Sequence, residues 1–185
     1  MATVAGKRIR VKDGTEVVVR SSEESDAPAF LEVRRALVLD GEGMIAEPDE
    51  FNKTEDEIRT WIATHVENPS NLLLVAEVQG RLVGSIDFEI ARRRRLAHSG
   101  HFAISVHPDW RNRGIGNALL GSLITWAQTI PEIEKINLKV RADNPRAIAL
   151  YRKHGFVQSG CEKDAIKLAE GVYVDDLAME RFVRS

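Results

Sequence analysis

A single cysteine, Cys161, stands among the 185 residues of this chain, so no disulfide bond can form within it. A lone cysteine fits the reducing interior of a cell, where structural disulfides are rare. The sequence lacks the Cys and His spacings of a structural zinc site, and no metal is expected. No apolar run approaches the roughly 20 residues that a membrane-spanning helix needs, and the first residues, Met-Ala-Thr-Val-Ala-Gly-Lys-Arg, lack the apolar core of a secretory signal. These absences predict a cytoplasmic protein without a membrane partner.

A strong excess of charge of one sign is also absent. The formal net charge is −2, which gives no reason to expect attraction to nucleic acid. No internal repeat or low-complexity linker divides the chain, so residues 1–185 are expected to form one domain. With 43% hydrophobic residues, the chain can bury a core of ordinary size.

The most informative segment that is present is Arg-Asn-Arg-Gly-Ile-Gly at residues 111–116. It follows an apolar run at 102–106 that predicts a strand, and it leads into a helical pattern over 115–127. Its two glycines let the backbone approach a ligand closely, and the N–H groups and dipole of the first helical turn favour an anion. The segment predicts a phosphate-binding loop, to which Arg111 and Arg113 add positive charge.

Two common phosphate motifs do not match this loop. The dinucleotide-binding fingerprint needs three glycines, whereas Leu119 occupies the third position. The Walker motif needs Gly-Lys-Ser/Thr, which the chain lacks. A nucleotide-binding module is therefore disfavoured.

Residues 135–157 form a second informative block. Apolar and polar residues alternate over 136–140, which predicts a strand. Asn144 and Pro145 suit the N-cap and first position of a helix. Gly155 suits the left-handed end of that helix, and a further strand follows it.

In this order and spacing, the two blocks resemble the GNAT superfamily of N-acetyltransferases, whose pyrophosphate loop follows the pattern Arg/Gln-x-x-Gly-x-Gly/Ala. The resemblance covers roughly residues 7–183. It implies the α/β (α+β) GNAT fold, a mixed, mostly antiparallel central sheet of about seven strands with helices on both faces. It also implies that strands 101–107 and 135–142 splay apart and hold CoA between them.

Local patterns predict the remaining elements. Lys12-Asp-Gly-Thr15 closes a hairpin over 7–20. Ser21 with Glu24, and Thr54 with Glu57, are candidate capping boxes at the starts of two helices. Further strands are expected over 72–78, 82–90, 99–107, 156–168 and 172–183.

The resemblance implies acetyl-CoA as the co-substrate. Backbone groups of the loop would hold the pyrophosphate, and the N–H of Val106 would bind the thioester oxygen. Asn144 would help to hold the pantetheine arm, with a role as helix cap alone as the alternative. The residues expected to bind the cofactor are Ser105, Val106, Arg111, Asn112, Arg113, Gly114, Ile115, Gly116, Asn117, Asn144, Ala147 and Tyr151.

Transfer of an acetyl group to an amine needs a base for the amine and an acid for the departing thiolate. The resemblance gives Tyr151 the role of acid, with packing of its helix on the sheet as the alternative. The base is open between His101, Glu89 and a chain of water molecules leading to either. In ribosomal-protein N-terminal acetyltransferases a glutamate occupies the position of Lys139. A lysine near its ordinary pKa of about 10.4 is no base, which argues against that substrate.

Two charged segments have alternative interpretations. Residues 92–95, four consecutive arginines, are predicted to form a solvated turn, with contact to the 3′-phosphate of CoA or to an acidic partner as the alternative. Acidic residues at 47–57 border the expected acceptor site and would suit a cationic amine such as a polyamine, an aminoglycoside or a peptide N-terminus. Solvent-facing charge is the simpler interpretation.

The sequence thus predicts an N-acetyltransferase that moves an acetyl group from acetyl-CoA to the primary amine of a small molecule or peptide, by direct attack in a ternary complex. The alternative is a non-catalytic acetyl-CoA-binding regulatory domain of the same fold. The terminal strands could pair across a homodimer, as in many members of this superfamily.

Overall fold

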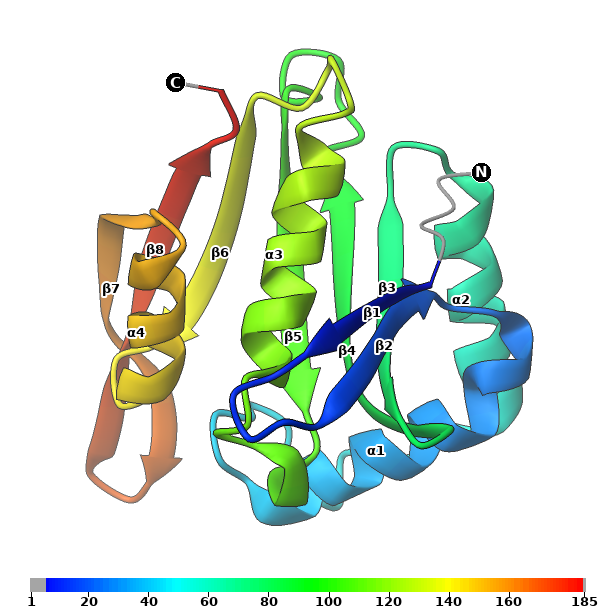
Figure 1. Ribbon diagram of the computed structural model, residues 1–185. Helices are drawn as coiled ribbons and strands as arrows, with labels where there is room; N and C mark the ends of the chain where they lie inside the picture. Colours follow the sequence, from blue (N-terminus) through cyan, green and yellow to red (C-terminus); the bar gives the residue numbers. More distant parts are fainter. Residues whose placement is uncertain (1–5, 185) are drawn as a thin grey trace.

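A hairpin of β1 (Lys7–Arg10) and β2 (Glu16–Ser21) opens the chain. In the computed structural model, which describes residues 6–184, this hairpin forms one edge of an eight-stranded sheet. The strand order is β1-β2-β3-β4-β5-β6-β8-β7 (Figure 1). The remaining elements are η1 (Glu24–Asp26), α1 (Ala27–Asp40), α2 (Glu55–Glu67), β3 (Leu72–Val78), β4 (Arg81–Ile90), β5 (Ser99–Val106), η2 (Pro108–Trp110), α3 (Ile115–Ala127), β6 (Lys135–Arg141), α4 (Pro145–Lys153), β7 (Val157–Ala169) and β8 (Val172–Phe182).

The order and class of these elements agree with the sequence prediction. The α+β fold with a mixed, mostly antiparallel sheet is confirmed, and within residues 6–184 the one parallel pairing is that of β5 with β6. The sheet has eight strands instead of about seven, because the N-terminal hairpin contributes two full strands. Its second strand, β2, pairs with β3 and so joins the hairpin to the rest of the sheet.

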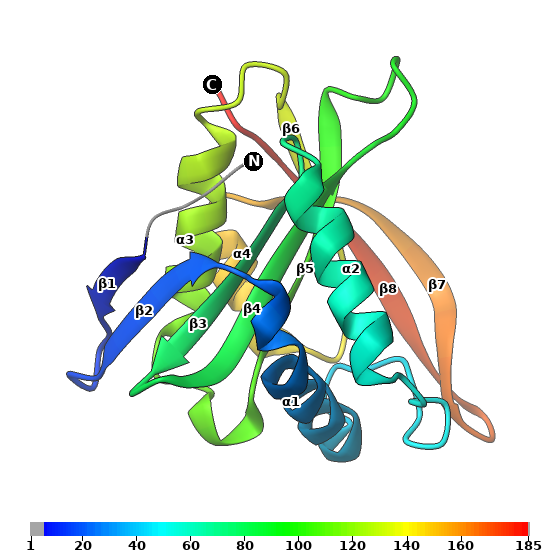
Figure 2. The ribbon, with the colours of Figure 1, turned by 90° about the vertical axis from the view of Figure 1, so that its right-hand side faces the viewer.

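Helices cover both faces of the sheet. Helices α3 and α4 lie on one face, whereas α1 and α2 lie on the other (Figures 1 and 2). One core, which includes Leu119 and Ile136, joins α3 and α4 to the sheet. A second core, which includes Phe30, Ile62 and Val75, joins α1 and α2 to it. Full burial of each such side chain contributes about 1.5–3 kcal/mol, so both layers are fixed mainly by apolar packing.

One of the two predicted capping boxes forms at the start of a helix. Thr54 and Glu57 form the expected reciprocal cap of α2. The predicted box of Ser21 with Glu24 is wrong, because Ser21 still belongs to β2. The reciprocal cap instead joins Glu23 to Asp26, whose carboxylate accepts from the Glu23 N–H at 2.8 Å.

Residues 6–184 contain neither a membrane-spanning helix nor a cluster of metal-binding side chains. No helix there is both long and apolar enough to cross a membrane. No group of three or more His, Cys, Asp or Glu side chains there is placed to hold a metal ion.

Candidate active site

Strands β5 and β6 pair only briefly before they separate. Residues 99–101 pair with residues 135–137, whereas β5 continues to Val106 and β6 to Arg141. This separation confirms the predicted splayed pair. It leaves one backbone edge of β5 without a strand neighbour, in the middle of the sheet.

The backbone of β5 points into this gap at Ile104 and Val106. Directly opposite residues in an antiparallel ladder alternate between hydrogen-bonded and non-hydrogen-bonded pairs. The N–H of His107 donates to the carbonyl of Val83 at 2.8 Å, and Val106 lies opposite Gly84 one step earlier. The Val106 N–H therefore faces away from β4, and the same alternation applies to Ile104. An extended ligand running along β5 could pair with both residues.

The predicted phosphate-binding loop has the backbone that such a loop requires. Asn112 and Gly114 have φ angles of 63° and 97°, and Gly114 is the N-cap of α3. None of the backbone N–H groups of residues 112–117 donates to another described residue, and the first helical bond runs from Ala118 to Gly114. These N–H groups and the positive end of the α3 dipole together form a site for an anion.

Gly116 brings the start of α3 close to the gap. A Cβ added there would lie 3.2 Å from the side chain of Leu150 on α4 and 4.0 Å from that of Val106 on β5. The loop, the end of β5 and α4 therefore converge, as the cofactor prediction requires.

The role predicted for Arg111 is wrong in one respect. Its guanidinium donates to the carboxylates of Asp40 and Glu42, the latter at 2.8 Å, and its backbone N–H donates to the Pro108 carbonyl at 3.2 Å. Two carboxylates neutralise its charge, so Arg111 ties the loop to the end of α1 and adds no net positive charge to the loop.

Arg113 and Ile115, two other residues of this segment, have different surroundings from Arg111. Arg113 is half-exposed, with its guanidinium carbon 4.7 Å from the centre of the Trp110 ring, and one carboxylate, that of Asp13, lies at the long distance of 3.9 Å from it. It therefore keeps a positive charge beside the loop. The Ile115 side chain is 1% exposed and belongs to the core, so only its backbone N–H can face a cofactor.

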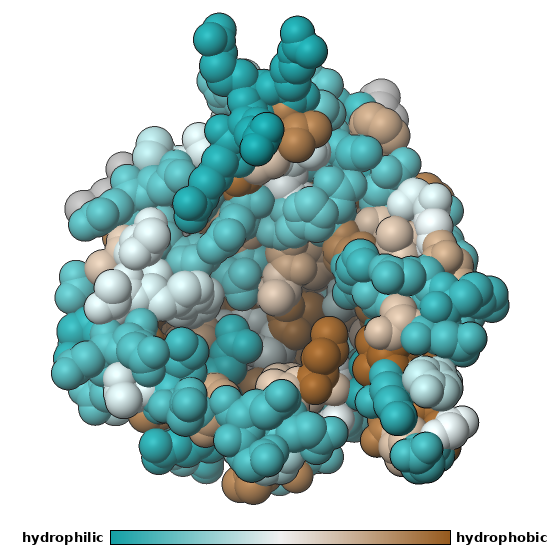
Figure 3. Space-filling model, turned by 180° about the vertical axis from the view of Figure 1, so that it is seen from behind, coloured by the Kyte–Doolittle hydropathy of each residue, from teal (hydrophilic) through white to brown (hydrophobic). Residues whose placement is uncertain are grey.

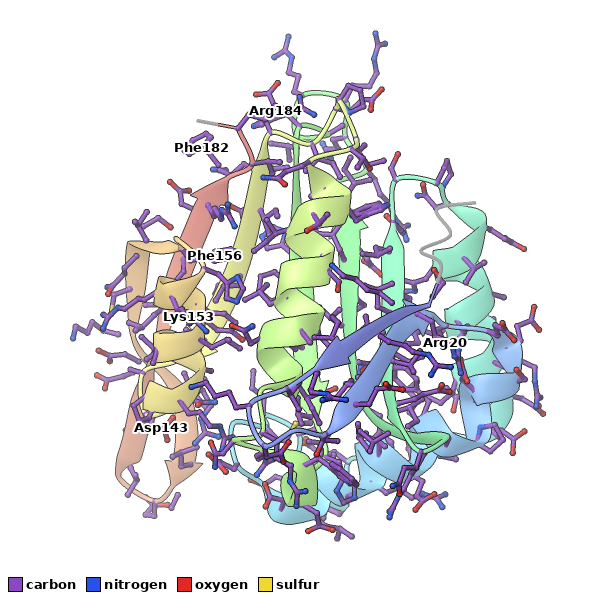
Figure 4. All side chains as sticks on the ribbon, in the orientation of Figure 1. Arg20, Asp143, Lys153, Phe156, Phe182 and Arg184 are labelled. Carbon is purple, nitrogen blue, oxygen red and sulfur yellow. The ribbon has the colours of Figure 1, made fainter. Side chains whose placement is uncertain are left out.

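Side-chain amides cap helix α4 and join it to α3. The Asn144 Oδ1 accepts from the Ala147 N–H at 3.0 Å, which confirms its role as N-cap. Asn117 Oδ1 accepts from the ammonium of Lys153 at 2.7 Å, which joins α3 to α4. Figure 4 shows Lys153 on α4, with Phe156 just beyond the helix and Arg20 on the other side of the molecule.

Tyr151 lies where it could serve both predicted roles. Its side chain is 7% exposed and packs edge-to-face against Phe102 and Phe156, with ring centres 5.7 and 6.1 Å away. Its hydroxyl has no hydrogen-bond partner among the described residues, yet it is not one of their fully enclosed polar atoms. Burial raises the pKa of Tyr151 to about 12, so the hydroxyl keeps its proton at neutral pH.

Polar side chains collect on the other face of the sheet, toward α1 and α2. Ile86, Phe88 and Phe102 point into the core beneath α3, so the alternate residues of β4 and β5 point the opposite way. Figure 3 views this face and shows a hollow near its centre. We call these alternate polar residues the polar floor: Ser85, Asp87 and Glu89 of β4 with His101 and Ser105 of β5.

The two predicted bases lie side by side on the polar floor, because Glu89 is directly opposite His101 in the ladder. Glu89 also meets a residue that the sequence did not single out. Its Oε1 lies 3.0 Å from Nε2 of His65 on α2, a side chain that is 2% exposed. The Nδ1 of His65 lies 3.0 Å from the carbonyl oxygen of Trp61.

Asp87 and Arg34 complete this group. Burial raises the pKa of Asp87, although the nearby charges of Arg34 and His65 oppose the shift. The guanidinium carbon of Arg34 lies 5.6 Å from the Phe30 ring centre and 5.8 Å from that of Trp61. Desolvation lowers the pKa of Arg34, and Arg34 has no hydrogen bond or ion pair with another described residue.

Arg34 and His65 thus belong to the site although sequence reasoning missed them. His65 continues the apolar stripe of α2 at Ile58, Trp61 and Ile62, and this spacing could have marked it as buried. No sequence pattern singles out Arg34, because it is one of two adjacent arginines in a helix.

The other charged candidates lie outside this group. Residues 92–95 form the predicted exposed turn, which lies at the start of β5, whereas the phosphate-binding loop follows its end. Lys139 is exposed and pairs with Glu162 at 2.9 Å and Asp176 at 3.4 Å. Residues 47–50 form an exposed loop, in which the Glu50 carboxylate accepts from the Glu47 N–H at 2.8 Å.

Similarity to solved structures extends over nearly the whole chain. A GNAT-family acetyltransferase from Streptococcus pneumoniae superimposes with a TM-score of 0.85, at 24% identity, over 90% of this chain and 99% of its own. The protein yncA from Salmonella typhimurium, solved with its cofactor acetyl-CoA, superimposes with a TM-score of 0.80, at 19% identity, over 91% of this chain and 95% of its own. At these identities the two structures establish the fold.

Sequence comparison establishes the family. The L-amino acid N-acetyltransferase AaaT of Escherichia coli (strain K12) is 29% identical over 171 residues, which span 90% of this chain and 98% of that protein. The model of the acetyltransferase (GNAT) family matches residues 38–156, well over half of the chain, and includes both the phosphate-binding loop and α4. The chain therefore belongs to the GNAT family of N-acetyltransferases.

Proposed function

We propose that the protein transfers an acetyl group from acetyl-CoA to the primary amine of a small molecule, by direct attack in a ternary complex. The observation that carries this proposal is the unpaired edge of β5 at Ile104 and Val106. The phosphate-binding loop follows one end of this edge, and the polar floor lies on the adjoining face of the sheet. A CoA ester could lie along that edge with its reactive end toward the polar floor.

The donor would be held mainly by backbone groups. The N–H groups of residues 112–117 would bind the pyrophosphate, with Arg113 beside them. Val106 would pair with the pantetheine arm, since β6 has already diverged there. Asn144 and Ala147 would border the arm from the start of α4.

The distance to the proposed bases favours Ile104 over Val106 as the oxyanion donor. Val106 lies opposite Gly84, five residues along β4 from Glu89, or about 17 Å at about 3.4 Å per residue. Ile104 presents the same edge and is adjacent to Ala103, which lies opposite Asp87. An amine held near Asp87 could therefore reach a thioester whose oxygen accepts from the Ile104 N–H.

The reaction removes two protons from the ammonium nitrogen and adds one proton to the departing sulfur. The ammonium would lose a proton to the carboxylate pair of Asp87 and Glu89, and burial, which raises the pKa of Asp87, makes its carboxylate a stronger base. The amine nitrogen would then attack the thioester carbon, and the carbon–sulfur bond would break as the tetrahedral intermediate collapses. The Tyr151 hydroxyl would protonate the departing thiolate and would regain its proton from solvent. The carboxylate pair would pass the first proton to solvent and then take the second proton of the nitrogen. The products are the N-acetylated amine and free CoA.

Calorimetric titration with acetyl-CoA, together with thiol release against a panel of primary amines, tests this proposal. We expect saturable binding and amine-dependent thiol release that Tyr151→Phe suppresses without weakening acetyl-CoA binding. Binding without turnover of any amine would favour the non-catalytic alternative. Absence of acetyl-CoA binding would overturn the proposal.

A further inference from the structure

Arg34 is a partly buried arginine without a hydrogen-bond or ion-pair partner among the described residues. Partly desolvated guanidinium groups are usually paired, because loss of water without a partner is costly. The nitrogen atoms of Arg34 are not fully enclosed, so a ligand can reach them. Among residues 6–184, the contacts of Arg34 are the faces of Phe30 and Trp61, and no carboxylate lies within ion-pair distance. Its N–H donors therefore have no protein acceptor in the described part of the chain.

Positive Arg34 lies near the negative carboxylates of Asp87 and Glu89. Asp87 interacts electrostatically with Arg34, His65 and Glu89, so all four groups belong to one cluster. The carboxylates come from the sheet, whereas Arg34 comes from α1 above it. The cluster thus offers acceptors for an ammonium group on one side and donors for an anion on the other.

Resting on the proposed function, we infer that the acetyl acceptor is an amine that carries a carboxylate close to its nitrogen, as an α-amino acid does, and that Arg34 binds this carboxylate. The planar guanidinium can donate two parallel hydrogen bonds to a carboxylate, and the aromatic faces hold it flat. The α-ammonium group then lies toward Asp87 and Glu89, on the side of Ile104. A polyamine lacks the anion, and its second cationic group would be repelled by Arg34.

The first part of the test uses the unaltered protein. Thiol release with acetyl-CoA is measured for L-leucine, L-methionine and L-phenylalanine, each beside its own carboxamide, with spermidine as a further amine. The carboxamide keeps the amine and the side chain and loses only the negative charge. We expect kcat/KM for the free acids to exceed that of their amides by at least about tenfold, which corresponds to one charged hydrogen bond.

The second part uses two adjacent arginines of α1 as a matched pair. Arg34→Met should remove the preference for the acids, mainly through a higher KM, while acetyl-CoA binding stays unchanged. Arg35→Met makes the same substitution at an exposed neighbour that has no described partner, and it should keep the full preference. Arg34→Lys should restore part of the preference, since a lysine supplies charge without the bidentate geometry.

The possible results separate this inference from the function on which it rests. Turnover of amides and acids at equal rates, or a preference that survives in Arg34→Met, would overturn the inference and leave the acetyltransferase proposal standing. Absence of thiol release with every amine would overturn both. Because the comparison of acids with amides needs no substitution, misfolding of a variant would not remove the test.

Discussion

The Nε2 atom of His65 on α2 lies 3.0 Å from the Oε1 atom of Glu89 on β4. The Nδ1 of the same ring faces the carbonyl oxygen of Trp61, which can only accept, so Nδ1 carries a proton. His65 Nε2 has no hydrogen-bond partner among the described residues, so the ring and the carboxylate lie in contact without a hydrogen bond between them. Glu89 is half-exposed and therefore connects the buried ring of His65 to solvent.

Glu89→Gln removes the carboxylate while it keeps the shape of the side chain. We expect kcat for amine acetylation to fall about 100-fold, the lower range for loss of a general base, with an unchanged Kd for acetyl-CoA. Steady-state thiol release and calorimetry measure the two quantities. Glu132→Gln, at an exposed position between α3 and β6, is the control and should leave both unaffected. A Glu89→Gln enzyme with the rate of the unaltered protein would remove Glu89 from the proton path.

His65 should act through Glu89 and not on the substrate directly. His65→Gln is therefore expected to lower kcat and to change the pH dependence of the rate. In the Glu89→Gln background, the same substitution should lower kcat almost no further. This double-mutant cycle distinguishes coupling from a general loss of packing, because independent effects would add. Additive losses in the double variant would show that His65 supports only the fold.

Tyr151→Phe should lower kcat about 100-fold through loss of the proton donor. Since burial raises the pKa of Tyr151 to about 12, ionisation of this hydroxyl cannot cause a fall in rate between about pH 8 and pH 10. For stability, a raised folded-state pKa means that the contribution is complete below the ordinary value of 10.0 and is lost as the pH rises toward 12. Tyr173→Phe alters the other tyrosine, which is 49% exposed, and should change neither rate nor stability.

Two glycines of α3 provide a test of the phosphate-binding loop. Gly116→Ala places a Cβ 3.2 Å from Leu150 at the mouth of the gap, and we expect the Kd for acetyl-CoA to rise at least about tenfold. Gly121→Ala places a Cβ at ordinary van der Waals distance, 3.8 Å from the ring of His154. It should leave acetyl-CoA binding unchanged and stabilise the protein by about 0.4–1 kcal/mol, as expected for glycine to alanine in a helix. Calorimetry and thermal unfolding measure both effects, and equal acetyl-CoA affinities would contradict the placement of Gly116.

A further prediction concerns stability away from the site. Arg20 donates to both carboxylate oxygens of Asp26, at 2.7 and 2.9 Å. Burial alone would raise the pKa of Asp26, but the hydrogen bonds from Arg20 and the Glu23 backbone outweigh it and hold the pKa below its ordinary value of 3.8. Asp26→Asn should therefore destabilise the protein by about 2 kcal/mol at neutral pH, since a charge-assisted pair is broken.

The loss of stability caused by Asp26→Asn should depend on pH, in a direction that the lowered pKa of Asp26 fixes. A lowered carboxyl pKa contributes stability that is complete above the unfolded-state value and is lost as the pH falls through the folded-state value. The difference between the unaltered protein and Asp26→Asn should thus be full at pH 7 and shrink below about pH 4 in denaturant titrations. Asp49→Asn, at an exposed position, is the control. A difference that stays constant down to about pH 2 would rule out this ionic origin.

Sequence patterns located the cofactor side of the protein because its determinants are contiguous. Residues 111–116 hold the strand end, the glycines and the helix start within one short segment, and backbone conformation follows locally from them. Asn144 likewise caps the helix that begins at the next residue. Arg111 was the exception, since Asp40 and Glu42, which take up its charge, lie about seventy residues earlier in the chain.

The acceptor side was decided by tertiary structure. Arg34, His65 and Glu89 come from α1, α2 and β4, and nothing in their local sequence relates one to another. The packing of both helices on the sheet brings the three side chains into one cluster with Asp87. The family, the order of elements and the conformation of the loop at 111–116 could be predicted from the sequence, because they depend on local backbone chemistry and hydrophobic periodicity. The charges that line the proposed acceptor site could not, because electrostatic interactions depend on distances in space, which the sheet register and helix packing set.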